Sequence, residues 1–212
     1  MTAGSDAPLV AVLDYGIGNL RSAEKALQRA GADARLVTEV ADARRADGVV
    51  LPGVGAFGAC MDALRASGLE SAAREGVESG RPFLGICVGM QMLFDASDEN
   101  PESRGLGVIP GRVRWIEGDV KRPQMQWNRL LPVTDDPMFV GLGDEPWVYF
   151  VHSLHGVPTD DSMVAATCEY GGPVNAAFRN GNVFATQFHP EKSGGSGLAL
   201  LGNFVKAVAG AR

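Results

Sequence analysis

Short apolar runs alternate with amphipathic segments in the first half of the chain. Leu9–Leu13 reads LVAVL, a continuous apolar run that predicts a strand buried on both faces. The turn DYGIGN follows, and apolar residues then recur at helical spacing, which predicts a helix with Asn19 as its N-cap. The apolar stripe of that helix consists of Leu20, Ala23, Leu27 and Ala30.

The same alternation continues as far as residue 86. Residues 34–37 and 48–51 are predicted to be the next two strands, and residues 83–86 a fourth. Two helical segments, residues 61–67 and 69–77, lie between the last two of these strands. A strand–helix–strand order of this kind is typical of a largely parallel sheet.

The pattern changes after Gly107 to stretches rich in strand-forming residues. A final amphipathic helix closes the chain, with an apolar stripe at Leu198, Leu201, Val205 and Val208. The fold class predicted for residues 1–212 is therefore a single α/β domain with a central, largely parallel mixed sheet flanked by helices. The β-rich stretches are residues 113–116, 146–151, 163–170, 174–178 and 182–188.

Composition and charge narrow the class of function. The 212 residues are 45% hydrophobic, enough for a sizeable core, and the net charge is −6. Basic residues form only short pairs, which argues against a nucleic-acid surface. The N-terminus lacks the features of a signal peptide, and no apolar run reaches membrane-spanning length. Three widely spaced cysteines favour a reducing compartment, so we expect a cytoplasmic protein without a metal site.

One cysteine has a distinctive setting. Cys87 follows an apolar strand and lies between two glycines in GICVG, which resembles the G-x-S-x-G nucleophile elbow with sulfur in place of oxygen. Such a turn places the side chain at the carboxyl end of a strand and at the N-terminus of a helix, where a thiolate is favoured. The sequence therefore predicts a cysteine nucleophile at Cys87, and Cys60 and Cys168 are interpreted as small core residues.

A thiolate nucleophile needs an acid/base partner, and the chain has three histidines. His189 follows an apolar strand, and Pro190 is expected to keep the chain extended, so that Glu191 lies on the same side and orients the imidazole. His152 is an alternative base and His155 a weaker one, although neither has a carboxylate close by in the sequence.

These motifs together resemble a known family. The segments GICVGMQ and QFHPEKS, with PGVGAF before them, resemble class I glutamine amidotransferases. The further segments DYGIGN, K-x-P-x-M-x-W-N and YFVHS, in this order, are similar to the glutaminase subunits of imidazole glycerol phosphate synthases. The resemblance extends over essentially the whole chain.

The resemblance implies a reaction and a partner. It implies that glutamine is hydrolysed to glutamate and ammonia through a thioester on Cys87, with His189 and Glu191 completing the triad and no cofactor or metal taking part. The ammonia would pass to a cyclase subunit with a (β/α)₈ barrel, in a heterodimer that makes imidazole glycerol phosphate and aminoimidazole carboxamide ribonucleotide for histidine biosynthesis. Neither a membrane nor a nucleic acid is implied as a partner.

The same resemblance assigns further residues to the site and to the partner surface. An oxyanion hole would be formed around Gly53, Val54 and Val88. Glutamine would be held by Gly55, Gln91 and the backbone around Ser153. The partner interface would include Asn19, Trp127 and Lys192.

The chain departs from the family pattern at three positions, and two other functions stay open. Gln124, Gln126 and Leu154 stand where the family usually has His, Gly and an aromatic residue, so the partner-facing surface is expected to differ in detail. The alternatives are a glutaminase of another ammonia-channelling synthase or a γ-glutamyl cysteine hydrolase, and a regulatory binding module with a silent site.

Overall fold

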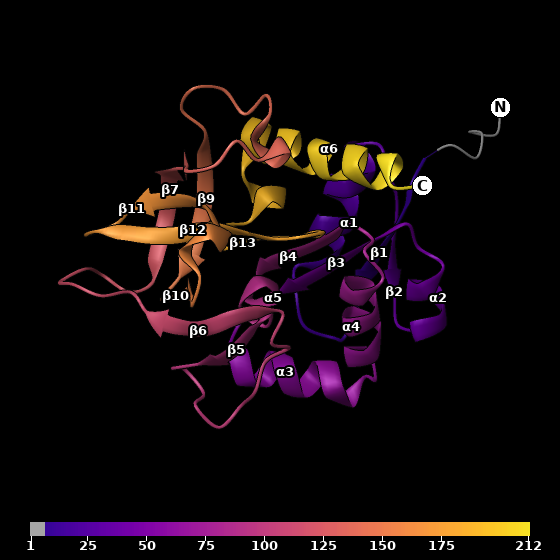
Figure 1. Cartoon of the computed structure of the whole chain (residues 1–212), viewed down its shortest axis with the longest axis horizontal. Coiled ribbons are helices and arrows are strands. Elements are labelled where there is room, and N and C mark those ends of the chain that lie inside the picture. Colours follow the sequence, from indigo (N-terminus) through magenta and orange to yellow (C-terminus); the bar gives the residue numbers. More distant parts are fainter. Residues whose placement is uncertain (1–6) are drawn as a thin grey trace.

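An eight-stranded sheet forms the centre of the protein in a computed structural model that describes residues 7–212 (Figure 1). Its strand order is β2-β1-β3-β4-β13-β12-β11-β8, so the strands that are first in sequence lie together at one edge. The bounds are β1 (Leu9–Leu13), β2 (Asp33–Val37), β3 (Gly48–Gly53), β4 (Phe83–Cys87), β8 (Leu131–Pro132), β11 (Val164–Glu169), β12 (Pro173–Asn180) and β13 (Val183–Thr186).

The sheet has a parallel part and an antiparallel part. Strands β2, β1, β3, β4 and β13 pair in parallel, whereas β12, β11 and β8 continue the sheet in antiparallel pairs. The fold class predicted from the sequence, a largely parallel mixed sheet flanked by helices, is confirmed. Strands β3 and β4 are buried along their whole length, as expected for strands covered on both faces.

Helices cover both faces of the sheet, with α6 and α1 above it and α3 and α4 below it in Figure 1. Helix α3 begins four residues before the predicted residue 61, at Phe57; the short helix α2 was not predicted, whereas the helix expected directly after Cys87 is present as α5. The bounds are α1 (Leu20–Arg29), α2 (Val40–Arg44), α3 (Phe57–Ala66), α4 (Glu70–Glu78), α5 (Val88–Gln91) and α6 (Gly194–Gly210). Single 3₁₀ turns occur at η1 (Pro137–Phe139), η2 (Asp161–Met163) and η3 (Pro190–Lys192).

Two small sheets lie beside the main one, and they contain strands that the sequence did not predict. Strands β10, β6 and β5 form a three-stranded sheet, and β7 pairs with β9 in an antiparallel ribbon. The ribbon buries Val148 and Phe150 on one face and exposes the other, which is the alternation of a strand with one solvated face. The bounds are β5 (Phe94–Ser97), β6 (Ile109–Trp115), β7 (Gln124–Arg129), β9 (Trp147–His152) and β10 (Leu154–Pro158).

The core lies between the main sheet and its helices. Its largest fully buried side chains are phenylalanines, among them Phe57, Phe83 and Phe184, which provide much of the apolar area removed from water. Within residues 7–212, none of the helices combines the length and the apolar character needed to cross a lipid bilayer.

Candidate active site

Cys87 lies at the sharp turn between β4 and α5. Its φ of 55° and ψ of −114° make it the non-glycine residue with positive φ among the residues that the structure describes. Such strain persists only where the surroundings impose it, and it is common at functional sites. Because α5 has only four residues, its dipole stabilises a negative charge at its N-terminus less than the dipole of a longer helix would.

The glycines around Cys87 are required by packing as well as by the turn. A Cβ on Gly89 would overlap the carbonyl oxygen of Leu51 on the neighbouring strand β3. A Cβ on Gly85 would lie 2.9 Å from Leu93 Cδ1 and 3.0 Å from Met90 Cα. The elbow therefore lies directly against the backbone of β3, and a glycine at position 89 allows this close approach.

This packing predicts a large effect of one methyl group. We expect Gly89→Ala to lower the free energy of unfolding by roughly 3 kcal/mol, because the new Cβ displaces either β3 or the elbow. Urea denaturation followed by circular dichroism measures this change. The matched control is Gly202→Ala on α6, where nothing lies within 4 Å of the added carbon. The control should be neutral or stabilising by up to about 1 kcal/mol, and equal destabilisation of both variants would contradict the packing explanation.

The parallel pairing of β13 with β4 brings His189 to the same edge of the sheet as Cys87. Thr186 pairs with Ile86, and the chain then continues through Gln187 and Phe188 to His189. Because the carboxyl ends of adjacent parallel strands meet at one edge, two residues 102 positions apart in the sequence lie at one site.

His189 and Glu191 form a buried pair. Nδ1 of His189 lies 2.8 Å from Oε1 of Glu191, and both side chains are only 2% exposed. The prediction of an extended chain here was wrong, because Pro190–Lys192 forms the 3₁₀ turn η3. A tight turn returns the carboxylate toward the imidazole two residues earlier, so the expected contact arises from a different backbone conformation.

The surroundings of His189 favour its charged form. Burial alone would lower its pKa, but Cys87 and Glu191 outweigh burial and raise the pKa of His189 to about 10. Nε2 of His189 makes no hydrogen bond with good geometry to the residues that the structure describes. The arrangement therefore places an imidazolium beside Cys87, with a proton available for transfer.

Asn19 contributes to this pair rather than capping a helix. It occupies the N-cap position of α1, but its side chain makes no capping hydrogen bond. Instead Nδ2 of Asn19 donates to Oε1 of Glu191 over 3.2 Å. The predicted N-cap position is therefore confirmed, but the side chain makes no capping hydrogen bond because it is engaged by a carboxylate 172 residues later in the sequence.

The other two histidines have structural contacts. Both ring nitrogens of His152 are engaged, Nδ1 with the Leu154 carbonyl at 2.7 Å and Nε2 with Oε1 of Gln124 at 2.8 Å. Burial lowers the pKa of His152 to about 4 and also lowers the pKa of His155. His155 lines a different cavity and accepts from the backbone N–H of Asn175 over 3.3 Å. The geometry favours His189 over both as the partner of Cys87.

A cavity of about 270 Å³ opens above Cys87 and His189. It is lined by most of the residues that the family resemblance assigns to the oxyanion hole and to glutamine. Gly53 is not in its lining and lies next to Cys87 in the β3–β4 pairing. Among residues 7–212 no cluster of His, Cys, Asp and Glu has the arrangement of a metal site. The assigned residues in the lining are Val54, Gly55, Val88, Gln91 and Ser153.

Two polar residues of the site were missed by sequence reasoning. Glu99 lines the cavity, and its Oε2 accepts the backbone N–H of Phe57 over 2.7 Å. Gln187 is fully buried: its Nε2 lies 3.8 Å from Sγ of Cys87, and its Oε1 accepts from Nε2 of Gln91 over 3.1 Å. Glu99 lies in the polar segment SDENPES, which has the composition of a solvated loop. Gln187 is distinguished in the sequence only by its position two residues before His189.

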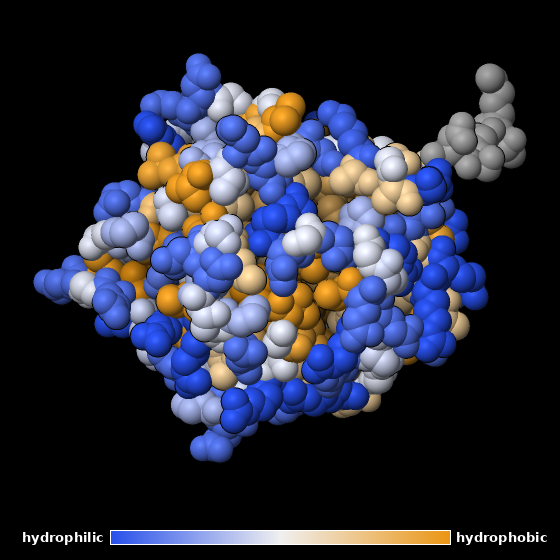
Figure 2. All heavy atoms as spheres, in the orientation of Figure 1, coloured by the Kyte–Doolittle hydropathy of each residue, from blue (hydrophilic) through white to orange (hydrophobic). Residues whose placement is uncertain are grey.

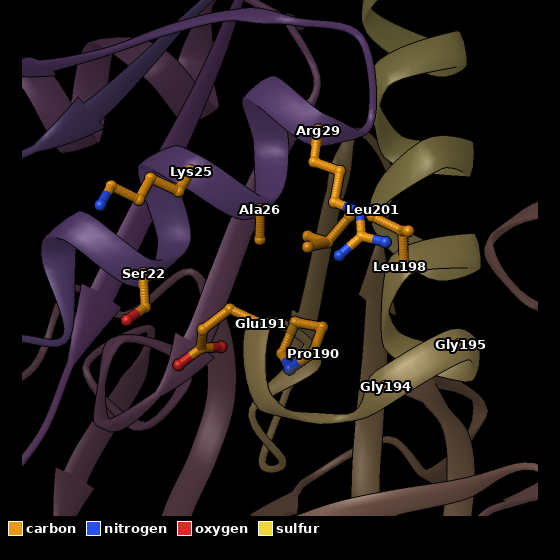
Figure 3. A pocket seen from close by; sticks show the side chains of 10 residues that line it. All are labelled: Ser22, Lys25, Ala26, Arg29, Pro190, Glu191, Gly194, Gly195, Leu198 and Leu201. Carbon is orange, nitrogen blue, oxygen red and sulfur yellow. The ribbon is translucent and has the colours of Figure 1, made fainter.

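Glu191 also borders a second cavity on the other side of the triad. This cavity of about 560 Å³ lies between α1 and α6, and Figure 3 shows the carboxylate of Glu191 directed toward α1. Lys25 and Arg29 on α1 line it, whereas Lys192 is exposed next to Glu191. The 3₁₀ turn η3, which directly follows His189, therefore lies between the cavity above Cys87 and an exposed surface that carries basic side chains.

An exposed apolar face lies close to this turn. Met125, Trp127 and Trp147 are 61%, 47% and 50% exposed and lie on the same face of the β7–β9 ribbon. A Cβ on Gly194 would be 3.8 Å from Cη2 of Trp127, so the face continues toward the start of α6. Figure 2 shows apolar residues exposed on the side of the molecule where Figure 1 places β7, β9 and β11. Exposed aromatic residues gathered on one face are typical of an interaction surface.

Comparison with known proteins identifies the family. The model of the class I glutamine amidotransferases matches residues 11–208, nearly the whole chain. The chain belongs to this family. Among solved structures, the crystal structure of a glutamine amidotransferase superposes with a TM-score of 0.75 at 25% sequence identity, covering 95% of this chain and 98% of that one.

Curated relatives in the amidotransferase family are considerably more similar. The imidazole glycerol phosphate synthase subunit HisH of Synechococcus sp. (strain JA-3-3Ab) is 52% identical over 204 residues, which covers 94% of each chain. The subunit of the same name from Methanothermobacter thermautotrophicus is 46% identical over 200 residues, covering 94% of this chain and 99% of the relative. The chain is thus similar over nearly its whole length to two relatives that carry the same subunit name.

Proposed function

We propose that this protein is the glutaminase subunit of an imidazole glycerol phosphate synthase, acting in the cytoplasm as a single catalytic domain. The observation that carries the proposal is the position of Cys87 on a strained elbow beside the buried His189–Glu191 pair, at one cavity. The similarity to relatives named as HisH subunits supports the choice of synthase.

The chemistry follows from the positions of these three residues. The Cys87 thiolate attacks the side-chain carboxamide carbon of glutamine, and the C–N bond breaks as His189 donates its proton to the departing ammonia. A γ-glutamyl thioester remains on Cys87. Water, deprotonated by His189, then attacks this thioester and releases glutamate and the free cysteine. Glu191 keeps the imidazole oriented and stabilises its cationic form throughout.

The tetrahedral intermediates of both steps carry a negative oxygen. The backbone N–H of Val88, at the start of α5, and that of Val54, in the loop after β3, are the proposed donors. Gly55, in the same loop, lines the cavity and has a φ of +89°, a conformation that a glycine adopts without strain. Gly53 allows β3 to lie against the elbow at this point.

To be bound, the α-ammonium group of glutamine needs an acidic partner, and its α-carboxylate needs amide N–H donors. Glu99 supplies a carboxylate for the ammonium group, and Gly55 and the backbone at Ser153 border the same cavity. Gln91 is held by Gln187 and by the Leu154 carbonyl, so its side chain has a fixed orientation. This arrangement suits an α-amino acid with a carboxamide side chain.

The ammonia needs a second subunit, proposed to be a (β/α)₈-barrel cyclase in a heterodimer. The exposed face formed by Met125, Trp127 and Trp147 is apolar, and the exposed Lys192 adds a positive charge on η3, which contacts β9. Asn19, at the N-cap of α1, reaches Glu191 of η3, and Lys192 belongs to the same turn, so two of the residues proposed for the interface lie at η3. Binding of the cyclase there would cover the outer side of the triad.

Purification with the cyclase and an assay of ammonia release test this function. The complex should release ammonia from glutamine and should not release glutamate from γ-glutamyl peptides, because these peptides carry the same amino-acid end but add a bulky group on the amide nitrogen inside a cavity of about 270 Å³. Glutamate released from both substrates would favour a γ-glutamyl hydrolase instead. A silent binding module would release none and would leave Cys87 unmodified by a glutamine-like electrophile.

The charge on His189 predicts a particular pH profile. Since Glu191 helps to raise the pKa of His189 to about 10, kcat/KM of the complex should fall as the pH rises through that value. In Glu191→Gln one of the two groups that raise this pKa is lost, whereas burial still lowers it. The alkaline limb should therefore move to lower pH by at least about one unit, in steady-state assays from pH 6 to pH 11. An unchanged limb would show that Glu191 does not stabilise the imidazolium.

A further inference from the structure

Tyr15 lies beneath the loop that carries the proposed oxyanion donor, residues 52–55. Its hydroxyl donates to the carbonyl oxygen of Pro52 over 2.6 Å, although the two residues are 37 positions apart. Tyr15 is only 5% exposed, and its hydroxyl also lies 3.8 Å from Sδ of Met92. Sequence reasoning gave this residue no role beyond the turn DYGIGN.

Cys60 holds the same loop from a second point. The thiol of this fully buried residue of α3 lies 3.2 Å from the carbonyl oxygen of Val54 and donates to it. Cys60 is therefore more than a small core residue, because its S–H group has a specific acceptor.

The two acceptors lie on either side of one peptide group. The Pro52 carbonyl belongs to the peptide before Gly53, and the Val54 carbonyl belongs to the peptide before Gly55. Between them lies the Gly53–Val54 peptide, which carries the N–H of Val54. A single peptide plane turns by opposite changes in the ψ before it and the φ after it, so its neighbours can stay fixed while it reorients.

We infer that Tyr15 and Cys60 are positioning residues for the oxyanion hole, which clamp the peptides on both sides and confine any reorientation to the Gly53–Val54 peptide. This inference rests on the proposed glutaminase function. Neither residue touches the substrate. The clamp acts by limiting the conformations of the loop to those in which the Val54 N–H is either directed at the reacting oxygen or turned by one peptide flip.

The ionisation and packing of the clamp agree with this role. Burial raises the pKa of Tyr15 and of Cys60, so both groups stay protonated at neutral pH and remain donors. A Cβ on Gly53 would lie 2.9 Å from the Tyr15 hydroxyl and 2.6 Å from the backbone nitrogen of Gly89. Substituting Gly53 would thus disturb the elbow as well, and the clamp is better tested at Tyr15 and Cys60.

The test uses the complex with the cyclase and its nucleotide ligand, and compares two reactions of Cys87. Glutamine hydrolysis needs the oxyanion hole, whereas alkylation by iodoacetamide needs only the thiolate. We expect Tyr15→Phe to lower kcat for glutamine about tenfold, as loss of one buried hydrogen bond allows, with KM within about twofold. The alkylation rate should be unchanged. Cys60→Ala should behave in the same way, and Cys60→Ser, which keeps a donor, should restore most of the activity.

The matched control is Tyr170→Phe, which removes an exposed hydroxyl that donates to the Lys121 carbonyl over 2.6 Å and should leave kcat unchanged. An unchanged kcat in Tyr15→Phe, or equal losses of kcat and alkylation rate, would overturn the clamp. Failure of the proposed function would look different, because the wild-type complex itself would then release no ammonia from glutamine.

Discussion

Cys87→Ser is expected to abolish glutamine-dependent synthesis by the assembled complex while ammonia-dependent synthesis continues at the wild-type rate. Removing the nucleophile of such a triad lowers kcat by at least about 10⁴-fold. The cyclase keeps its activity because the elbow cysteine produces ammonia and does not use it. The two rates are measured on one sample, with glutamine or with ammonium chloride as the nitrogen source.

The matched control for this substitution is Cys168→Ser. Cys168 is also buried, but its sulfur lies 3.8 Å from Nε2 of Gln124, far along the sequence from the elbow. This variant should retain both activities. If ammonium failed to restore synthesis in a Cys87→Ser complex that still assembles, the proposed division of labour between the subunits would be wrong.

The second large effect concerns the cyclase partner. We expect the nucleotide-loaded cyclase to raise kcat for glutamine by about 10²- to 10³-fold over the isolated subunit, the range that one missing oxyanion donor produces. The reason is that the Gly53–Val54 peptide adopts its active orientation fully only when the partner binds that conformation more tightly. KM for glutamine should change much less, since the cavity residues Gln91 and Glu99 are held by contacts within the chain.

Steady-state glutaminase assays of the free subunit, the complex and the nucleotide-loaded complex measure this stimulation. The matched control is the complex without nucleotide, which separates assembly from activation. A free subunit that hydrolyses glutamine as fast as the loaded complex would show that the loop is already active and that no peptide has to turn.

Much of the parallel half of the fold could be predicted from the sequence, because its strands are continuous apolar runs between helical segments. Phe83–Cys87 and Leu9–Leu13 are examples, and both lie inside the main sheet. The position of Cys87 at the end of β4 could also be predicted, since GICVG carries the glycines that such a turn needs.

Other features depend on contacts that no local pattern reports. Strand β7 reads QMQWNR, and its alternation is reversed: the apolar residues Met125 and Trp127 are exposed, whereas the buried residue is Gln124, which is satisfied by His152. Asn19 looks like a helix cap but contacts Glu191, and Gln187 is defined by Gln91 and Cys87, almost 100 residues earlier. Long-range hydrogen bonds decide the roles of these residues, so the sequence alone could not predict them.

The central claim is that Cys87 is the residue that attacks glutamine, and covalent labelling tests it most directly. The complex is treated with a glutamine-like electrophile, such as a chloroketone analogue, and the modified residue is identified by peptide mass spectrometry. We predict one adduct, on Cys87, formed more slowly when glutamine is present, with loss of glutaminase activity in proportion to labelling. An adduct on Cys60 or Cys168, or inactivation without modification of Cys87, would contradict the account.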